Sequence, residues 1–275
     1  MYKRQLGTTE LDIVGTGLSG SFLVSDRLSL GFGVTYFSGT VENQGSVYVV
    51  DVFPDTFWDQ NSFFDHRRWV TSTFTADDSD IGFNVGVLWK FAESWRLGAV
   101  YRNGPTFDYE LYTRAGPLHP EPEGTVLASV TDRSIAFPDV WGVGVAYRSP
   151  SGSLTVGFEW VRVEYSVISK TLDSPLVDAS FVAIDDANEL RLGTEYVFLE
   201  SSPLIAIRGG LWYDPDHRFR YTGDDVFSQA LYRQGQDLLH VTAGIGIAFK
   251  DFQIDLGADL SQNADVVALS AIYSF

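Results

Sequence analysis

Hydrophobic residues alternate with small or polar residues along most of the chain, in segments of about ten. From Phe252 to Leu260 every second residue is apolar, and Gln253, Asp255 and Asp259 fall on the opposite face. Residues 239–249 and 267–275 show the same alternation. A period of two is the pattern of a β-strand, whereas a helix would show a period of 3.6. The sequence therefore predicts an all-β protein.

The same alternation defines the individual strands and their limits. A strand at 153–168 needs a change of phase near Trp160, which a β-bulge would supply. A further strand within residues 41–78 or 113–138, for instance around 125–136, remains an alternative. The predicted strands are residues 9–24, 27–40, 79–91, 95–112, 136–149, 153–168, 188–199, 203–214, 238–249, 252–261 and 265–275.

Alternation alone fits either a soluble sandwich or a membrane barrel. The two differ only in whether the apolar face points to the protein core or to lipid. Two features favour the barrel. Full charges lie within strands on the polar face, and aromatic residues gather where strands meet one set of turns, as in the girdle at a membrane interface. These aromatic residues are Phe91, Trp95, Tyr147, Phe198, Phe249, Phe252, Tyr273 and Phe275.

The connections between strands are of two lengths. Turns such as 25–26, 92–94 and 250–251 are short, whereas the alternate connections are mostly long. Outer-membrane barrels have short periplasmic turns and long extracellular loops. We therefore expect an antiparallel transmembrane β-barrel in the bacterial outer membrane. Its long extracellular loops would be residues 41–78, 113–138, 169–187 and 215–237.

Composition narrows the function classes. The 275 residues carry a net charge of −17, which argues against binding nucleic acid because phosphates attract cationic surfaces. The chain has no cysteine, so it has no disulfide, thiol nucleophile or cysteine-ligated metal. The acidic pairs within 77–80, 185–186 and 224–225 lack an EF-hand spacing, and we interpret them as solvated loops rather than Ca²⁺ sites. No metal or cofactor is expected.

The order of the strands suggests how the chain is organised. If the last strand runs towards the periplasm, ten reversals make the first of eleven strands run the same way. Bacterial barrels normally have an even number of strands with both ends periplasmic. We therefore expect residues 1–275 to be a single barrel domain that is incomplete at its N-terminus and lacks the export signal.

Six segments share a characteristic order and spacing: FPDVWGVGVAYR (137–148), LTVGFEW (154–160), GVLWK (86–90), WRLGAVYRNGP (95–105), LRLGTEY (190–196) and IRGGLWYD (207–214). Together they resemble the FadL/TodX family of outer-membrane transporters of hydrophobic compounds. The resemblance covers residues 79–275 clearly and 9–40 weakly. It implies a fourteen-stranded barrel with an N-terminal hatch, of which this chain would supply the last eleven strands.

The resemblance implies passive uptake of long-chain fatty acids or other hydrophobic compounds across the outer membrane. The loop 41–78 is unusually apolar, and large exposed apolar patches tend to be binding sites. The aromatic residues could instead pack the loop on itself. The candidate ligand-binding residues are Phe53, Phe57, Trp58, Phe63, Phe64, Arg67 and Arg68, with His66 as a further possible carboxylate partner.

Charged residues on the polar face would line the lumen, either along a solute path or, more commonly, as a salt-bridged ladder. They are Arg96, Arg102, Glu159, Arg162, Arg191, Glu195, Arg208, Asp255 and Asp259.

We expect no enzymatic activity, because none of the four histidines lies beside a recognisable nucleophile motif. A general porin, or a structural or adhesive barrel, is the alternative function. Expected partners are outer-membrane lipid and lipopolysaccharide, a hydrophobic small molecule, and the barrel assembly machinery through the strand ending at Phe275.

Overall fold

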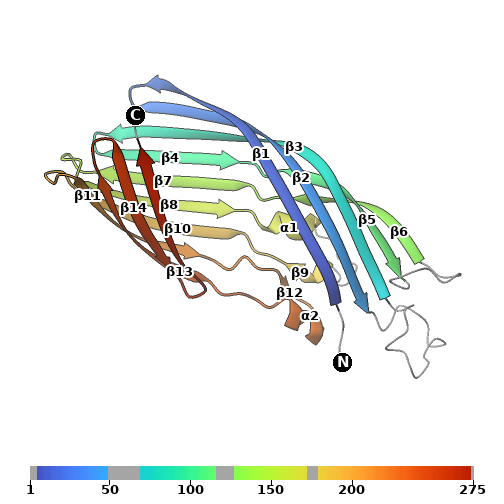
Figure 1. The fold of residues 1–275 in the computed structure, drawn as a ribbon. Coiled ribbons are helices and arrows are strands. Elements are labelled where there is room, and N and C mark those ends of the chain that lie inside the picture. Colours follow the sequence, from blue (N-terminus) through green and yellow to red (C-terminus); the bar gives the residue numbers. More distant parts are fainter. Residues whose placement is uncertain (1–4, 49–68, 116–126, 172–178, 274–275) are drawn as a thin grey trace.

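A computed structural model describes residues 5–48, 69–115, 127–171 and 179–273 (Figure 1). Its main feature is one curved antiparallel sheet, whose principal path contains eleven strands. In their order across the sheet these are β1 (Gln5–Ser25), β2 (Leu28–Tyr48), β3 (Trp69–Ala92), β4 (Trp95–Arg102), β7 (Val140–Arg148), β8 (Leu154–Val163), β10 (Ala187–Phe198), β11 (Leu204–Asp214), β13 (Leu238–Ala248), β14 (Phe252–Leu260) and β15 (Asp265–Tyr273).

Each of the eleven predicted strands has its counterpart in this path, so the all-β class and the antiparallel order are confirmed. Chain neighbours are also sheet neighbours, as in an up-and-down barrel wall. Within the described residues β1 and β15 form the two edges of the sheet and are not paired with each other. In that same part of the chain, no helix is long and apolar enough to cross a membrane.

The sheet extends further at the long-connection end than the alternation predicted. β2 continues to Tyr48 and β3 begins at Trp69, so residues 41–48 and 69–78 of the expected first loop are strand. Two more strands, β5 (Thr106–Ala115) and β6 (Leu127–Ala136), form a hairpin there. The alternative strand around 125–136 therefore exists as β6. It leads into β7 across the break at 137–139 and does not add a twelfth strand to the principal path of the sheet.

Two predicted strands, 95–112 and 136–149, are each broken once. β4 stops at Arg102 and β5 starts at Thr106, while β6 stops at Ala136 and β7 starts at Val140. A proline lies in each break, Pro105 and Pro138, and proline has no N–H for the ladder. The breaks lock together: Phe137 N donates to Pro105 O (2.8 Å), and Gly104 N donates to the Asp139 carboxylate (2.9 Å).

The breaks leave residues 76–82 of β3 without a backbone ladder on one side. β3 pairs with β4 only from Asn84 onwards and with β5 only up to Thr75. Side chains fill part of the gap, because the backbone N–H groups of Thr106 and Asp108 donate to the carboxylates of Asp80 and Asp78, both at 2.7 Å. Backbone N–H groups without a partner in the neighbouring strand need another acceptor, and here two carboxylates provide it.

The predicted bulge near Trp160 is wrong. β8 pairs in continuous register with both β7 and β10 and ends at Val163. The apolar residues of β8 nevertheless lie on both faces of the sheet. Val161 and Val163 lie on the otherwise polar face, where they pack with Ala187 in a small buried cluster.

Short elements lie in the long connections. They are α1 (Ser166–Thr171), the 3-10 turn η4 (Ala179–Phe181), β9 (Val182–Ala183), β12 (Arg220–Tyr221) and α2 (Val226–Leu231). β9 pairs with β12, so the β8–β10 and β11–β13 connections contact each other (Figure 1). These connections correspond to the predicted loops 169–187 and 215–237.

Candidate functional site

The sheet has an apolar face and a polar face, which the strand register defines. Trp95, Trp141 and Phe158 are exposed on the apolar face. The polar face carries eight of the nine charged residues predicted to line the lumen, namely Arg96, Arg102, Glu159, Arg191, Glu195, Arg208, Asp255 and Asp259.

Arg162 departs from the expected position. Because β8 has no change of phase, Arg162 shares the apolar face with Phe158 and Trp160. It lies at the long-connection end of the strand, where its guanidinium donates to Asp186 at 2.8 Å. Arg162 therefore stabilises the β8–β10 connection instead of facing the interior.

Arg208 forms the first ion-pair group on the polar face. Its Nε donates to Glu195 Oε2 at 2.6 Å, and its Nη1 donates to Asp255 Oδ1 at 2.5 Å. Gln253 Nε2 donates to the second oxygen of Asp255 at 2.6 Å. One arginine thus joins β10, β11 and β14, and its charge is matched by two carboxylates.

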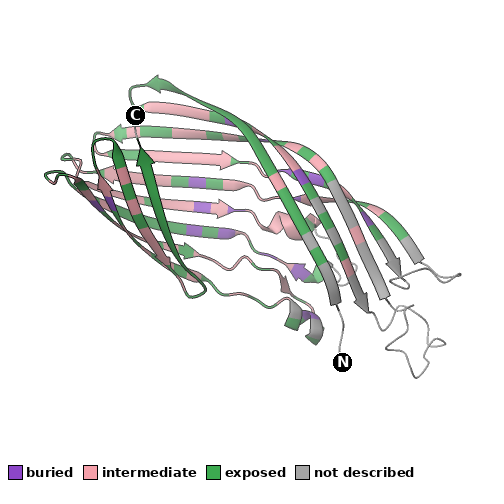
Figure 2. Cartoon of the chain, in the orientation of Figure 1, coloured by how far each residue is buried: buried purple, intermediate pink, exposed green. Residues whose placement is uncertain are grey.

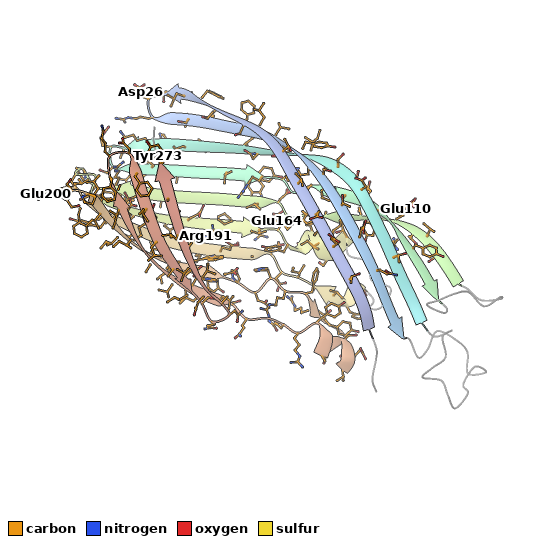
Figure 3. The ribbon with its side chains drawn as sticks, in the orientation of Figure 1. Asp26, Glu110, Glu164, Arg191, Glu200 and Tyr273 are labelled. Atoms are coloured by element: carbon orange, nitrogen blue, oxygen red, sulfur yellow. The ribbon has the colours of Figure 1, made fainter. Side chains whose placement is uncertain are left out.

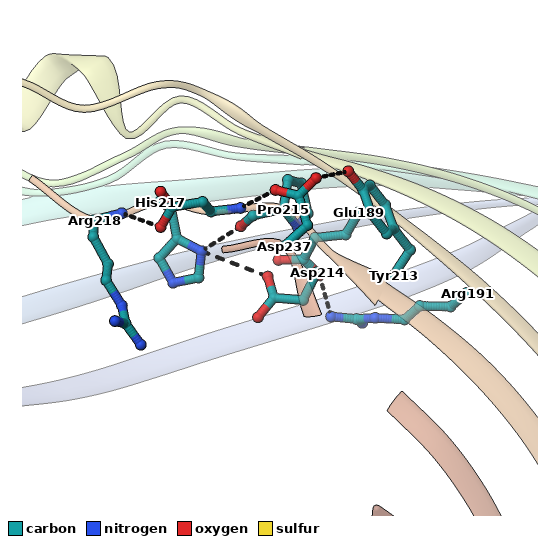
Figure 4. A network of polar contacts seen from close by, with 9 residues as sticks. Glu189, Arg191, Tyr213, Asp214, Pro215, His217, Arg218 and Asp237 are labelled. Carbon is teal, nitrogen blue, oxygen red and sulfur yellow. Dashed lines mark hydrogen bonds and ion pairs between the residues drawn. The ribbon is translucent and has the colours of Figure 1, made fainter. Parts of the chain in front are cut away.

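Arg191 forms the second group. Arg191, labelled in Figure 3, contacts Glu189 at 2.5 Å (Figure 4). Its guanidinium also lies 3.5 Å from Glu159 and 5.0 Å from the ring centre of Trp212. Trp212 stacks on His240 with ring centroids 4.2 Å apart, and His240 Nδ1 lies 3.0 Å from Asp259. A cation over an indole face is attractive, so this row is a continuous polar layer from β8 to β14.

Three of these residues were not predicted. Glu189, Trp212 and His240 follow the same alternation as Arg191 and Arg208, so their place on the polar face could have been inferred from phase. Their contacts could not, because each joins different strands. Within the described residues the buried Trp212 Nε1 and His240 Nε2 have no hydrogen-bond partner.

Hollows follow the polar face beside these groups. One of about 750 Å³ is lined by both ion-pair groups and by Gly193, Gly210 and Gly244. A second, of about 490 Å³, extends from Arg191 across Gly157 and Gly144 to Arg96. Glycine has no side chain, so the space above the sheet stays open between the charged side chains.

The long-connection end has a different interior. Phe107 is fully buried, and its ring lies about 2.9 Å from where a Cβ on Gly39 would stand. Val161, Val163 and Ala187 form the buried cluster at the same end, shown in purple on β8 and β10 in Figure 2. The sheet therefore carries apolar packing near the long connections and paired charges further along the strands.

The connections above this end are held by polar contacts. Arg220 makes two hydrogen bonds to Asp185 (2.5 and 2.8 Å), which lower the pKa of that carboxyl below its usual range. The Tyr213 hydroxyl donates to Asp237 and lowers its pKa in the same way (Figure 4). His217 stacks on Tyr165 with centroids 4.7 Å apart. The Arg220–Asp185 pair and the His217–Tyr165 stack hold the β8–β10 connection against the β11–β13 connection.

The predicted ligand-binding residues of the first loop lie outside the described residues, as does Phe275. The former are Phe53, Phe57, Trp58, Phe63, Phe64, Arg67 and Arg68, together with His66. In the ranges that the structure does describe, no group of three or more His, Cys, Asp or Glu could hold a metal ion.

Comparison with known proteins connects this architecture to a family. A family model described as outer membrane protein transport protein (OMPP1/FadL/TodX) matches residues 2–218. A search of curated proteins gave no match.

Solved structures share the fold. A Pseudomonas aeruginosa FadL homologue has a TM-score of 0.64 and 16% identity, with 97% of this chain and 69% of that chain covered. The Ralstonia pickettii toluene transporter TbuX has a TM-score of 0.58, 14% identity and the same coverage. A TodX deltaS2S3 mutant, a monoaromatic hydrocarbon channel, has a TM-score of 0.54 and 15% identity, with 96% and 69% covered.

Proposed function

Because this chain belongs to the OMPP1/FadL/TodX family of outer-membrane transport proteins, we propose that it takes up long-chain fatty acids or related hydrophobic compounds across the outer membrane. The family consists of transporters of hydrophobic compounds rather than enzymes. The outer membrane also explains the two faces of the sheet, since exposed Trp141 and Phe158 suit lipid and the paired charges suit an interior.

The observation that carries the proposal is the match to the family model over residues 2–218. On the polar face, Arg191 and Arg208 are each held by two carboxylates, so neither guanidinium in the hollow of about 750 Å³ is unpaired, and each group keeps one negative charge in excess. The apolar end of the sheet at Phe107 and Val163 suits a solute that is mostly hydrocarbon.

The structural relatives differ in substrate. One is described as a toluene transporter, one as a FadL homologue and one as a monoaromatic hydrocarbon channel. We place this chain with carriers of long-chain compounds, and the loop 41–78 would supply the apolar surface that first binds them. Lipopolysaccharide would surround the loops, and the barrel assembly machinery would recognise the strand ending at Phe275.

Uptake by living cells tests the proposal. Bacterial cells without their own fatty-acid uptake protein would express this protein, and uptake of radiolabelled oleate would be measured over a range of concentrations. Saturable uptake several-fold above that of cells carrying an empty vector is expected. A stable ion conductance in planar bilayers, without any uptake of oleate or toluene, would contradict the proposal and favour a porin.

A further inference from the structure

Arg96, the second residue of β4, differs from Arg191 and Arg208, the other basic residues that line the hollows of the polar face. Arg191 and Arg208 are each held by two carboxylates. Arg96 is exposed on the polar face, and the described residues offer it neither an ion pair nor a hydrogen bond. Its positive charge is therefore uncompensated by the protein in this part of the chain.

The surroundings of Arg96 form a hollow of about 490 Å³. Its floor is bare backbone at Gly98, Gly144 and Gly157, and no atom lies within 4 Å of where a Cβ on Gly157 would stand. The carboxylate that lines the hollow, Glu159, faces Arg191 on the far side at 3.5 Å. Of the two arginines that line this hollow, Arg191 is thus held by carboxylates and Arg96 is not.

An apolar side chain borders the same hollow. Leu88 is an apolar residue on the polar face, and 49% of it is exposed. Its Cδ1 is 3.9 Å from the Cβ position of Gly98, so the leucine lies over the glycine floor. An exposed leucine beside an unpaired arginine offers contacts for both parts of an amphipathic anion.

A second hollow continues from the first. It has about 520 Å³ and shares Leu88, Gly98, Gly144 and Glu159 with it, before reaching Val100 and Gly142 towards the long-connection end. Across the sheet the two hollows together reach from Ser21 on β1 to Gly193 on β10, six strand spacings apart. At roughly 4.8 Å per spacing this is ~29 Å, more than the ~15 Å that one acyl layer contributes to a bilayer core, so a long chain fits along the hollows.

We propose that Arg96 binds the carboxylate of a long-chain solute, whose hydrocarbon chain lies over Leu88 and along the two hollows. The inference rests on the proposed function and narrows its substrate class to carboxylates rather than neutral aromatics. A guanidinium bonds a carboxylate with two parallel, charge-assisted hydrogen bonds, which a neutral solute cannot form. Arg96 is then a specificity-determining residue for the head group.

The experiment compares a charged solute with a neutral one of the same chain. Outer-membrane vesicles containing the full chain would be titrated with radiolabelled oleate and, separately, with oleyl alcohol. The variants are Arg96→Gln, Arg96→Lys and, as the matched control, Arg27→Gln, whose arginine pairs with Glu93 in a turn outside both hollows. Heat-modifiable gel mobility would verify that each variant is folded.

We expect Arg96→Gln to weaken oleate binding by about tenfold while oleyl alcohol binding stays unchanged, because only the charge-assisted bonds are lost. Arg96→Lys should recover part of the loss, and Arg27→Gln should behave as the unmodified protein. An equal effect on both solutes, or no effect on oleate, would overturn the inference and leave the transport function standing. If the unmodified protein binds neither solute, the proposed function fails as well.

Discussion

Gly104 lies where the two strand breaks meet. A Cβ added there would stand 2.2 Å from Phe137 O and 2.7 Å from Pro138 O, both backbone atoms that cannot rotate away. Gly193 is the opposite case, since nothing lies within 4 Å of its Cβ position. The same residue type therefore has two different roles: packing requires glycine at position 104, whereas Gly193 leaves open space.

Substituting each glycine by alanine separates these roles. Gly104→Ala should lower the free energy of unfolding by about 1–3 kcal/mol, the usual cost of overpacking, because the two breaks must move apart. Gly193→Ala should change it by less than about 0.5 kcal/mol. Urea unfolding of the protein in vesicles, followed by tryptophan fluorescence, measures both. Equal stability of the two variants would show that the breaks are not in contact.

At the scale of elements, the strands were predictable because lipid and lumen impose a period of two on every crossing. The breaks at 103–105 and 137–139 were also signalled, by Pro105 and Pro138, although alternation on either side masked them. The ion pairs were not predictable. Arg208 and Asp255 are 47 residues apart, and only the register of β11, β13 and β14 brings them together. Such contacts depend on pairing between strands, which one strand's pattern does not contain.

The contact between the two long connections should depend on pH through Asp185. Arg220 lowers the pKa of Asp185 below its ordinary 3.8, so the pair adds stability above that value and loses it as the pH falls through the lower folded pKa. Because Asp185 is 64% exposed, the pair contributes at most about 1 kcal/mol.

Hydrogen exchange at the Thr222 amide, which donates to Phe181 O at 2.7 Å, reports this contact. Asp185→Asn should speed that exchange up to about fivefold at pH 7, consistent with a change of up to about 1 kcal/mol. The difference between variant and unmodified protein should shrink as the pH falls below 3.8 and through the lower pKa of folded Asp185. The control is Asp224→Asn, at an exposed position in the β11–β13 connection, which also contains Thr222. A difference that persists unchanged at low pH would rule out the ion pair as its cause.

At the scale of the whole molecule, the two ends of the sheet are unlike. One end has tight turns such as 149–153, and the other has the connections that carry α1, α2 and the β9–β12 pair (Figure 1). A membrane barrel of this family presents its long connections to the outside, which we predict here for residues 164–186 and 215–237.

Cysteine labelling tests that orientation cleanly, because the chain has no cysteine of its own. D224C, in a long connection, should react with a membrane-impermeant maleimide in intact cells. S151C, in a tight turn, should react only after the outer membrane is permeabilised. The cysteine-free protein gives the background. Labelling of S151C in intact cells, with D224C protected, would reverse the orientation.

The ion-pair groups have a consequence for how the chain is assembled. A slip of one residue in any strand moves all its side chains to the other face. For β11 such a slip would carry Arg208 away from Glu195 and Asp255 and into lipid, where an arginine costs about 2–4 kcal/mol near the bilayer midplane. Since Arg191 and Arg208 together join β8, β10, β11 and β14, their ion pairs favour the native register of these strands over a slipped one.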